Sequence, residues 1–159
     1  MQTFDNIDRL ILQKLQLNGD AKNKDLADAV GLSASACLAR VMRLQRAGII
    51  IGYRAALDLD KLGHSITAIT EITLAKHDFA LMRAFEKTLQ KMPEVVQVHR
   101  VNGPSDFILW IVCESMQRYQ EINDILISRE NCIAHVNTHI ALGCVKLFNG
   151  YPVERLIKI

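Results

Sequence analysis

The segment that decides the fold of the first part of the chain is GLSASACLARVMRLQRAG, residues 31–48. Gly31 begins a tight turn, and Ser33 is a residue type that caps the N-terminus of a helix. The apolar residues that follow have helical spacing, and Gly48 is the glycine that commonly lies just past a helix end. The segment therefore predicts a turn followed by a helix from Ser33 to about Ala47.

Two shorter helices precede this segment. Apolar residues recur at helical spacing from Ile7 to Leu15, and Asn23 precedes a helix of about two turns that Gly31 ends. Two helices joined by a short glycine-containing turn indicate a helix-turn-helix. After Gly48, the β-branched and aromatic run over residues 49–54 predicts a strand that begins a wing. We therefore expect a winged helix-turn-helix domain over residues 1–54.

Positive charge is concentrated in this first part. The whole chain carries 19 Lys and Arg against 17 Asp and Glu, and this net charge of +2 is too small to indicate nucleic acid by itself. Between Ala29 and Leu57, however, there is no acidic residue, and this interval contains Arg40, Arg43, Arg46 and Arg54. A compact positive patch favours binding to phosphate. The alternative is an ordinary solvated helix face.

On a wheel of about 100° per residue, the helix after Ser33 has two faces. One arc predicts core packing and holds Cys37, Leu38, Val41 and Leu44. The opposite arc holds Ser35, Ala36, Ala39, Met42, Arg43 and Arg46, with Arg40 at its boundary. Small residues let a helix enter the major groove, while arginines reach bases or phosphates. The predicted DNA contacts are Ser33, Ser35, Ala36, Arg40, Arg43, Arg46 and Arg54. A helix packed on a partner subunit would also carry small residues, so that alternative stays open.

From His64 onward, the pattern changes to strands that alternate with amphipathic helices. Strands are predicted near residues 65–74, 95–101, 106–113 and 133–142, with helices after Asp78 and Ser115. The order βαββαβ is that of a ferredoxin-like domain, an antiparallel sheet with two helices on one face. We therefore predict an α+β protein with a linker strand over residues 55–64 and a ferredoxin-like domain over residues 65–159. Because both faces of the strands are apolar, we expect a second subunit to cover the open face in a homodimer.

Several classes of protein are not indicated. The 4 cysteines lack a Cys-x-x-Cys pair, which predicts free thiols. Cys132, His135 and His139 resemble a metal-ligand cluster, but a structural zinc site needs four ligands, so we expect no metal. No nucleophile with a neighbouring base and no phosphate loop stands out, so we expect no enzyme and no catalytic residue. Without a membrane-length apolar run or a signal-peptide pattern, we expect a cytoplasmic protein that does not enter the membrane.

Four runs of residues resemble the Lrp/AsnC family of leucine-responsive regulators. They are FDNIDRLIL (4–12), LSASACLARVMRL (32–44), GIIIGYRA (48–55) and the linker-like LDKLG (59–63). The resemblance extends over nearly the whole chain. It implies a reader of double-stranded DNA joined to an amino-acid-sensing domain, and dimers that often assemble into octamers. It also implies regulation by a free amino acid bound between sensing domains.

The resemblance also implies an effector site. The family has a Gly-Asp-Tyr-Asp-like turn between its second and third sensing strands; here Gly103 and Asp106 are kept, while Pro104 and Ser105 replace the acidic and aromatic residues. Asp106 is the candidate for the effector's ammonium, and backbone N–H groups of the turn are candidates for its carboxylate. The implied effector residues are Asn102, Gly103, Pro104, Ser105, Asp106, Val136 and Thr138. A turn-capping role for Asp106 and ordinary strand packing for Val136 and Thr138 stay open.

Together these features predict an amino-acid-responsive transcription regulator with leucine or methionine as its effector. Effector binding can change DNA occupancy only if the assemblies of the protein bind the effector with different affinity. We therefore expect the effector to shift assembly. The alternative function is an amino-acid sensor whose helical part contacts a protein partner rather than DNA.

Overall fold

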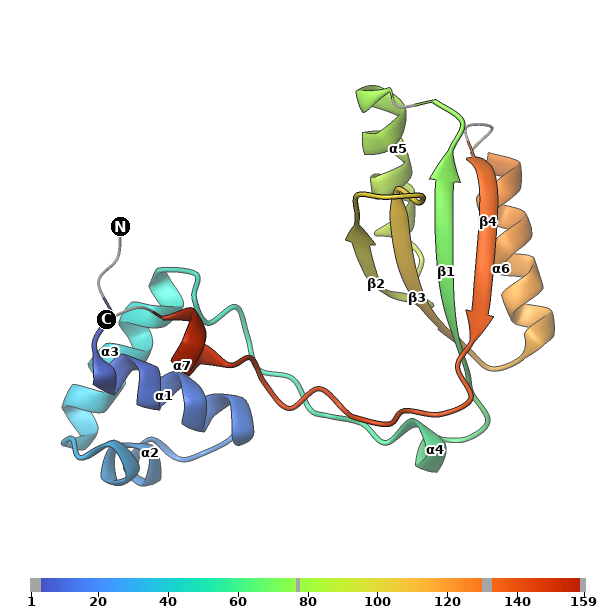
Figure 1. Cartoon of the computed structure of the whole chain (residues 1–159). Coiled ribbons are helices and arrows are strands. Elements are labelled where there is room, and N and C mark those ends of the chain that lie inside the picture. Colours follow the sequence, from blue (N-terminus) through green and yellow to red (C-terminus); the bar gives the residue numbers. More distant parts are fainter. Residues whose placement is uncertain (1–3, 77, 130–132, 158–159) are drawn as a thin grey trace. The chain divides into compact units, whose positions relative to one another are not determined.

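The computed structural model describes residues 4–76, 78–129 and 133–157, and the chain divides into two compact units (Figure 1). The first unit contains the residues up to Ala56 together with those from Lys146 onward, and the second contains Leu57–Val145. The first is helical, and the second is a four-stranded sheet with two long helices. The α+β class expected from the sequence is thereby confirmed.

Three helices form most of the first unit: α1 (Asn6–Leu17), α2 (Asn23–Val30) and α3 (Ala34–Arg46). Their inward side chains share one core, which includes the fully buried Ile11 and Leu44. Gly31 ends α2 with a left-handed φ of 71°, and the Ser33 side chain caps α3 by accepting the N–H of Ala36. The predicted helix-turn-helix is therefore present as α2 and α3.

The C-terminal segment belongs to the first unit, whereas we expected residues 65–159 to form the second domain. Its short helix α7 (Val153–Leu156) lies on α1, where Gln13 donates to Glu154 over 2.6 Å. The N–H of Tyr151 donates to Gln16, and Ile157 packs against the helical core. A segment this short has too little periodicity to reveal from sequence which core it joins.

Two other segments differ from the prediction in secondary structure. Residues 49–54, expected as a wing strand, are not in a strand; the N–H groups of Ile49 and Ile50 both donate to the carbonyl of Leu44. A strand requires a hydrogen-bonded neighbour, and the described residues provide no such neighbour for this run. Over residues 55–64, the expected linker strand is replaced by the one-turn helix α4 (Leu59–Leu62).

The second unit has the predicted βαββαβ order. Its elements are β1 (Ile66–Leu74), α5 (Phe79–Leu89), β2 (Val95–Arg100), β3 (Phe107–Cys113), α6 (Met116–Arg129) and β4 (Ile133–Ile140). The strands lie in the order β2-β3-β1-β4, and every neighbouring pair is antiparallel. Side chains of α5 and α6 share one core with the sheet, including Phe85, Phe107 and Ile122. Both helices therefore cover the same face of the sheet, and neither covers the other face, which is called the open face below (Figure 1).

Candidate DNA-reading helix and effector pocket

Burial divides α3 into an inner and an outer side. Cys37, Val41 and Leu44 are buried, but Leu38, which we expected in the core, is 48% exposed. Leu38 lies about 90° from the centre of the buried arc, so its side chain leaves the core. The predicted DNA contacts Ser33, Ser35, Ala36, Arg43, Arg46 and Arg54 are exposed, and Arg40 is half-buried.

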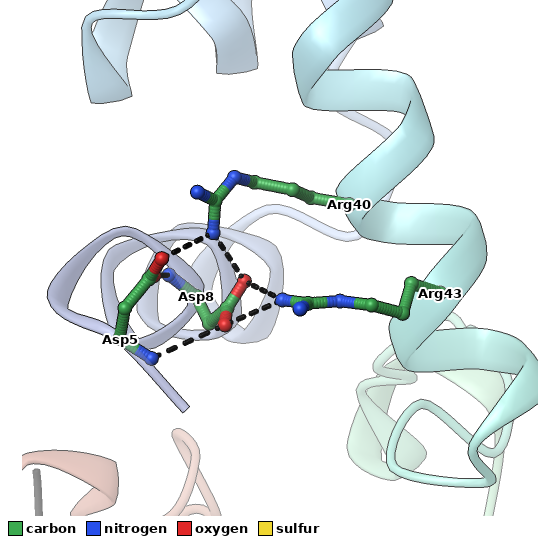
Figure 2. A network of polar contacts seen from close by, with 4 residues as sticks. All are labelled: Asp5, Asp8, Arg40 and Arg43. Atoms are coloured by element: carbon green, nitrogen blue, oxygen red, sulfur yellow. Dashed lines mark hydrogen bonds and ion pairs between the residues drawn. The ribbon is translucent and has the colours of Figure 1, made fainter. Parts of the chain in front are cut away.

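Two of the predicted DNA contacts, Arg40 and Arg43, are bound to acidic residues at the start of α1 (Figure 2). Arg40 Nη1 lies 2.7 Å from Asp5 Oδ2 and 2.9 Å from Asp8 Oδ1. Arg43 Nη2 donates to both carboxylate oxygens of Asp8, over 2.5 and 2.6 Å. Asp8 is only 1% exposed, so its charge is neutralised by α3 rather than by water. The two arginines thus hold α3 against α1.

Asp5 and Asp8 are also joined by a capping box at the start of α1. The N–H of Asp8 donates to Asp5 over 2.8 Å, and the N–H of Asp5 donates to Asp8 over 3.2 Å. The hydrogen bond from the Asp8 N–H, and then that from Arg40, lower the pKa of Asp5. Hydrogen bonds to Asp5 and Asp8 raise the pKa of Arg40. Both shifts favour the charged forms.

Asp8 was not among the functional residues predicted from the sequence, although the sequence carries a signal for it. Asp8 lies at helical spacing from Ile11, Leu12 and Leu15, on the apolar side of α1. A carboxylate at such a position must find a partner, because an unpaired buried charge is costly. The arginines of the acid-free segment, residues 29–57, were the obvious candidates for this partner.

The candidate effector pocket lies between α6 and β4. It has a volume of about 420 Å³, within the range typical of small-molecule sites. Its lining is Tyr119, Asn123 and Ile127 of α6, with Ile133, Ala134, Val136 and Thr138 of β4. The pocket thus contains both of the strand residues that the sequence analysis assigned to the effector site. No lining side chain carries a formal charge.

Three hydroxyl groups connect the pocket to the core. The Thr138 hydroxyl contacts that of Tyr119 closely and lies 3.2 Å from that of Thr70. The hydroxyls of Thr70 and Tyr119 are 3.3 Å apart, and Thr70 is completely buried. The three therefore satisfy one another, and the wall of the pocket is polar without being charged.

The β2–β3 turn contains the remaining predicted effector residues, Asn102 to Asp106. The Asp106 carboxylate accepts the N–H of Leu74 over 2.7 Å, and the Asp106 N–H donates to the carbonyl of Ile72 over 2.8 Å. Thr73 donates to the Pro104 carbonyl, and Ser105 donates to Glu71. The turn is thus fastened to the end of β1. Because β1 also pairs with β4 there, the turn and the Val136 end of the pocket lie at the same end of the sheet.

The cysteines and histidines are the other side chains that could bind a metal or react. Cys132 lies outside the described residues, so the cluster with His135 and His139 is not described; within the described ranges, no group of three His, Cys, Asp or Glu side chains could hold a metal ion. Burial raises the pKa of the Cys37 and Cys113 thiols, which keeps them protonated. Within residues 4–76, 78–129 and 133–157, no helix has the length and hydropathy of a membrane span.

A helix-turn-helix joined to a ferredoxin-like unit with a small pocket defines the class of ligand-responsive DNA-binding proteins. Two family models match this chain. Residues 4–51 match a winged helix-turn-helix DNA-binding model, and residues 67–150 match the Lrp/AsnC ligand binding domain. The chain belongs to the Lrp/AsnC family. It is therefore a DNA-binding transcriptional regulator with a ligand-binding domain, and not an enzyme.

Individual relatives are similar over almost the whole chain. The leucine-responsive regulatory protein of Rhizobium meliloti is 37% identical over 144 residues, 90% of this chain and 92% of the relative. The protein of the same name from Haemophilus influenzae is 34% identical over 148 residues, 93% and 89% of the two chains.

Solved structures show the same fold. An AsnC family transcriptional regulator from Agrobacterium tumefaciens is 28% identical, with a TM-score of 0.88 and coverage of 96% of this chain and 99% of that one. A transcriptional regulator from Neisseria meningitidis, solved as a complex with L-methionine, is 26% identical, with a TM-score of 0.88 and coverage of 97% and 99%.

Proposed function

We propose that the chain regulates transcription in response to a free amino acid, which binds in the pocket between α6 and β4. The observation that carries the proposal is that Val136 and Thr138, the two strand residues implied by the family resemblance, both line that pocket. Its aliphatic side chains Ile127, Ile133 and Val136, together with its uncharged hydroxyl groups, suit an uncharged side chain. Leucine and methionine are therefore the proposed effectors, and the methionine complex of the neisserial relative supports this choice.

The β2–β3 turn is the proposed site for the charged ends of the effector. The N–H groups of Gly103 and Ser105 make no hydrogen bond within the part of the chain that the structure describes, so they can receive a carboxylate. Asp106 remains the proposed partner of the ammonium, and its bond to the Leu74 N–H holds it at the end of β1. Asn102 and Pro104 complete the turn.

The proposed DNA surface is the outer side of α3 with the residues that flank it. Ser33, Ser35 and Ala36 lie at the start of the helix, where backbone N–H groups favour phosphate. Arg46 and Arg54 are exposed and form no ion pair with any residue in the described ranges. Arg40 and Arg43 also belong to α3, but Asp8 already binds them.

Self-association is the proposed link between effector and DNA. The open face of the sheet carries partly exposed apolar side chains, among them Ile69, Ile108 and Trp110. A second copy that covers this face would form the homodimer, and dimers would assemble further to octamers. An effector that binds one assembly more tightly shifts the population towards it. The proposed location is the cytoplasm.

The experiment is a gel-shift titration with the DNA upstream of the protein's own gene, at several salt concentrations, with random competitor and a panel of amino acids. We expect specific, salt-dependent binding that leucine or methionine alters. Light scattering with and without the effector tests the change in assembly. If no shift occurs at any salt concentration while an amino acid still binds, the function is the alternative one, a sensor that contacts a protein partner.

Two matched variants locate the effector. Val136→Arg fills the pocket and is expected to abolish the amino-acid response while retaining DNA binding. Gln117→Arg adds the same charge on the exposed side of α6 and is expected to retain both. An unchanged response in Val136→Arg would place the effector elsewhere.

A further inference from the structure

The side of α3 directly opposite its buried arc is apolar at its centre. Ser35, Ala39, Met42 and Arg46 recur at intervals of four, three and four residues, so they form one stripe along the helix. All four are exposed, and Met42 is 40% exposed. A helix that enters a groove presents this stripe to the floor of the groove, because its buried side must face its own core.

Arg40 and Arg43 lie beside this stripe, on the flank that faces α1 (Figure 2). To reach a base, Arg43 would have to leave both oxygens of Asp8, which is 1% exposed. Release of Arg43 would remove the two shortest hydrogen bonds of this buried carboxylate and leave Asp8 with Arg40 and the Asp5 N–H alone. The geometry therefore assigns these arginines to holding α3 rather than to reading sequence.

The chemistry of the stripe limits what it can read. In the major groove, the edge of each base pair offers hydrogen-bond donors and acceptors, and the apolar group it offers is the methyl of thymine. An alanine methyl packs against such a group, and the flexible thioether of methionine adapts to its position. Neither side chain can form the bidentate hydrogen bonds that identify guanine or adenine.

We propose that Ala39 and Met42 determine the DNA sequence specificity of this chain by contacting thymine methyl groups in the major groove, while Arg40 and Arg43 act as positioning residues. The inference rests on the proposed function, since it requires α3 to enter DNA. The DNA partner is a half-site with thymine opposite the centre of α3. Arg46 and Ser35, at the two ends of the stripe, supply phosphate or polar contacts.

The test removes single methyl groups from the DNA. Footprinting on the DNA upstream of the protein's own gene first locates the half-site, and synthetic duplexes then replace each thymidine with deoxyuridine. One buried methyl group corresponds to about a fourfold change in affinity. We expect wild-type protein to prefer thymidine by about this factor at one or two positions. Met42→Ala should bind the thymidine duplex more weakly and lose the preference at one position.

The control for truncation of methionine is Met116→Ala, an exposed methionine of α6 in the second unit, which should keep the full preference. A half-site without thymine, equal affinity for both duplexes, or an unchanged preference in Met42→Ala would overturn the proposal. Failure of the proposed function would give a different result, namely no specific binding at any salt concentration. That result would also overturn this inference.

The positioning role is tested by salt dependence at a temperature where circular dichroism shows each variant folded. Removing one phosphate contact lowers the slope of log affinity against log salt by about one. We expect Arg46→Gln to lower it by that amount. Arg43→Gln and Asp8→Asn should instead keep the wild-type slope and the wild-type thymidine preference. Both variants should reduce the ratio of specific to non-specific affinity. A purely stabilising role would leave this ratio unchanged. A slope lowered in Arg43→Gln would show a phosphate contact and overturn the assignment.

Discussion

The two units bury their polar groups in opposite ways. Among the described residues, two polar side chains are almost completely buried, Asp8 in the first unit and Thr70 in the second. Asp8 is an acid held by two partly exposed arginines, whereas Thr70 is neutral and shares hydrogen bonds with Tyr119 and Thr138. Asp8 binds two arginines of the candidate DNA-reading helix, and Thr70 contacts two residues that line the candidate pocket. Charge therefore holds α3, and neutral hydrogen bonds shape the pocket.

This difference has an energetic consequence. A buried charge that loses its partners retains its full desolvation cost, whereas a lost hydroxyl removes one hydrogen bond of modest net value. The first unit is thus sensitive to changes on α3 that leave Asp8 in place. The second unit should tolerate changes around Thr70, because two hydroxyls still satisfy each other after the third is removed.

The largest effect is expected from removing both partners of Asp8. Arg40→Met with Arg43→Met leaves the carboxylate buried and unpaired, which should destabilise the first unit by about 3 kcal/mol. Hydrogen exchange measured peptide by peptide would show faster exchange in α1 to α3 and unchanged exchange in the sheet. Arg46→Met, on the exposed side of the same helix, should change little. A loss below about 1 kcal/mol in the double variant would show that Asp8 does not depend on these arginines.

A smaller effect tests which residues belong to the helical unit. Ile157 packs partly buried against the core of α1 to α3, while its neighbour Leu156 is 64% exposed. Ile157→Ala should cost about 1.5 kcal/mol, and Leu156→Ala only a few tenths. The loss should appear as faster exchange in α1 and not in β1 to β4. Faster exchange in the sheet instead would place the C-terminal segment with the second unit.

The fold was largely predictable because its helices and strands carry extended apolar signals. The apolar residues around Leu26 and Leu44 recur at helical spacing, and the continuous apolar run over residues 107–113 indicates a strand. The βαββαβ order then defines the sheet. The segment after residue 145 could not be assigned, because its main apolar anchor, Ile157, has no periodic context. The prediction of a wing strand was wrong for a different reason: residues 49–54 have strand propensity, but no ladder partner for them lies among the described residues.

Local signals in the sequence predicted only part of the candidate site. Ser33 caps α3, as its residue type indicated, whereas Val136 and Thr138, which line the pocket, came from the family resemblance and their effector role stays a prediction. The arginines show the limit of this approach, because a guanidinium suits phosphate and carboxylate equally well. Only the structure shows that Asp8, distant in sequence, binds Arg40 and Arg43.

An effect of about 1 kcal/mol is expected at the neutral counterpart of Asp8. Thr70→Val keeps the shape of the side chain and removes its hydroxyl, while the hydrogen bond between Tyr119 and Thr138 persists. Thermal unfolding followed by the fluorescence of Trp110, the single tryptophan of the chain, reports on the sheet. Thr67→Val, the same change at a partly exposed position of β1, serves as the control. Equal losses in the two variants would mean that the buried hydroxyls do not stabilise the unit.

The smallest effect concerns pH and separates the charged from the neutral arrangement. Because the Asp8 N–H and Arg40 lower the pKa of Asp5, the folded state binds fewer protons than the unfolded state in mild acid. The resulting stability is present above the unfolded pKa of about 3.9 and is lost as the pH falls through the folded pKa. The Asp5 side chain is 49% exposed, so its contribution to the free energy of unfolding is only about 0.5 kcal/mol.

Urea unfolding of the helices from pH 6 to pH 3 should therefore show a steeper loss of stability in wild type than in Asp5→Asn, which keeps a good N-cap residue. The exposed Asp20→Asn should follow wild type, and the Thr70→Val loss should not depend on pH in this range, because no charge is involved. Parallel curves for wild type and Asp5→Asn would show that the capping box, and not the charge of Asp5, accounts for its contribution.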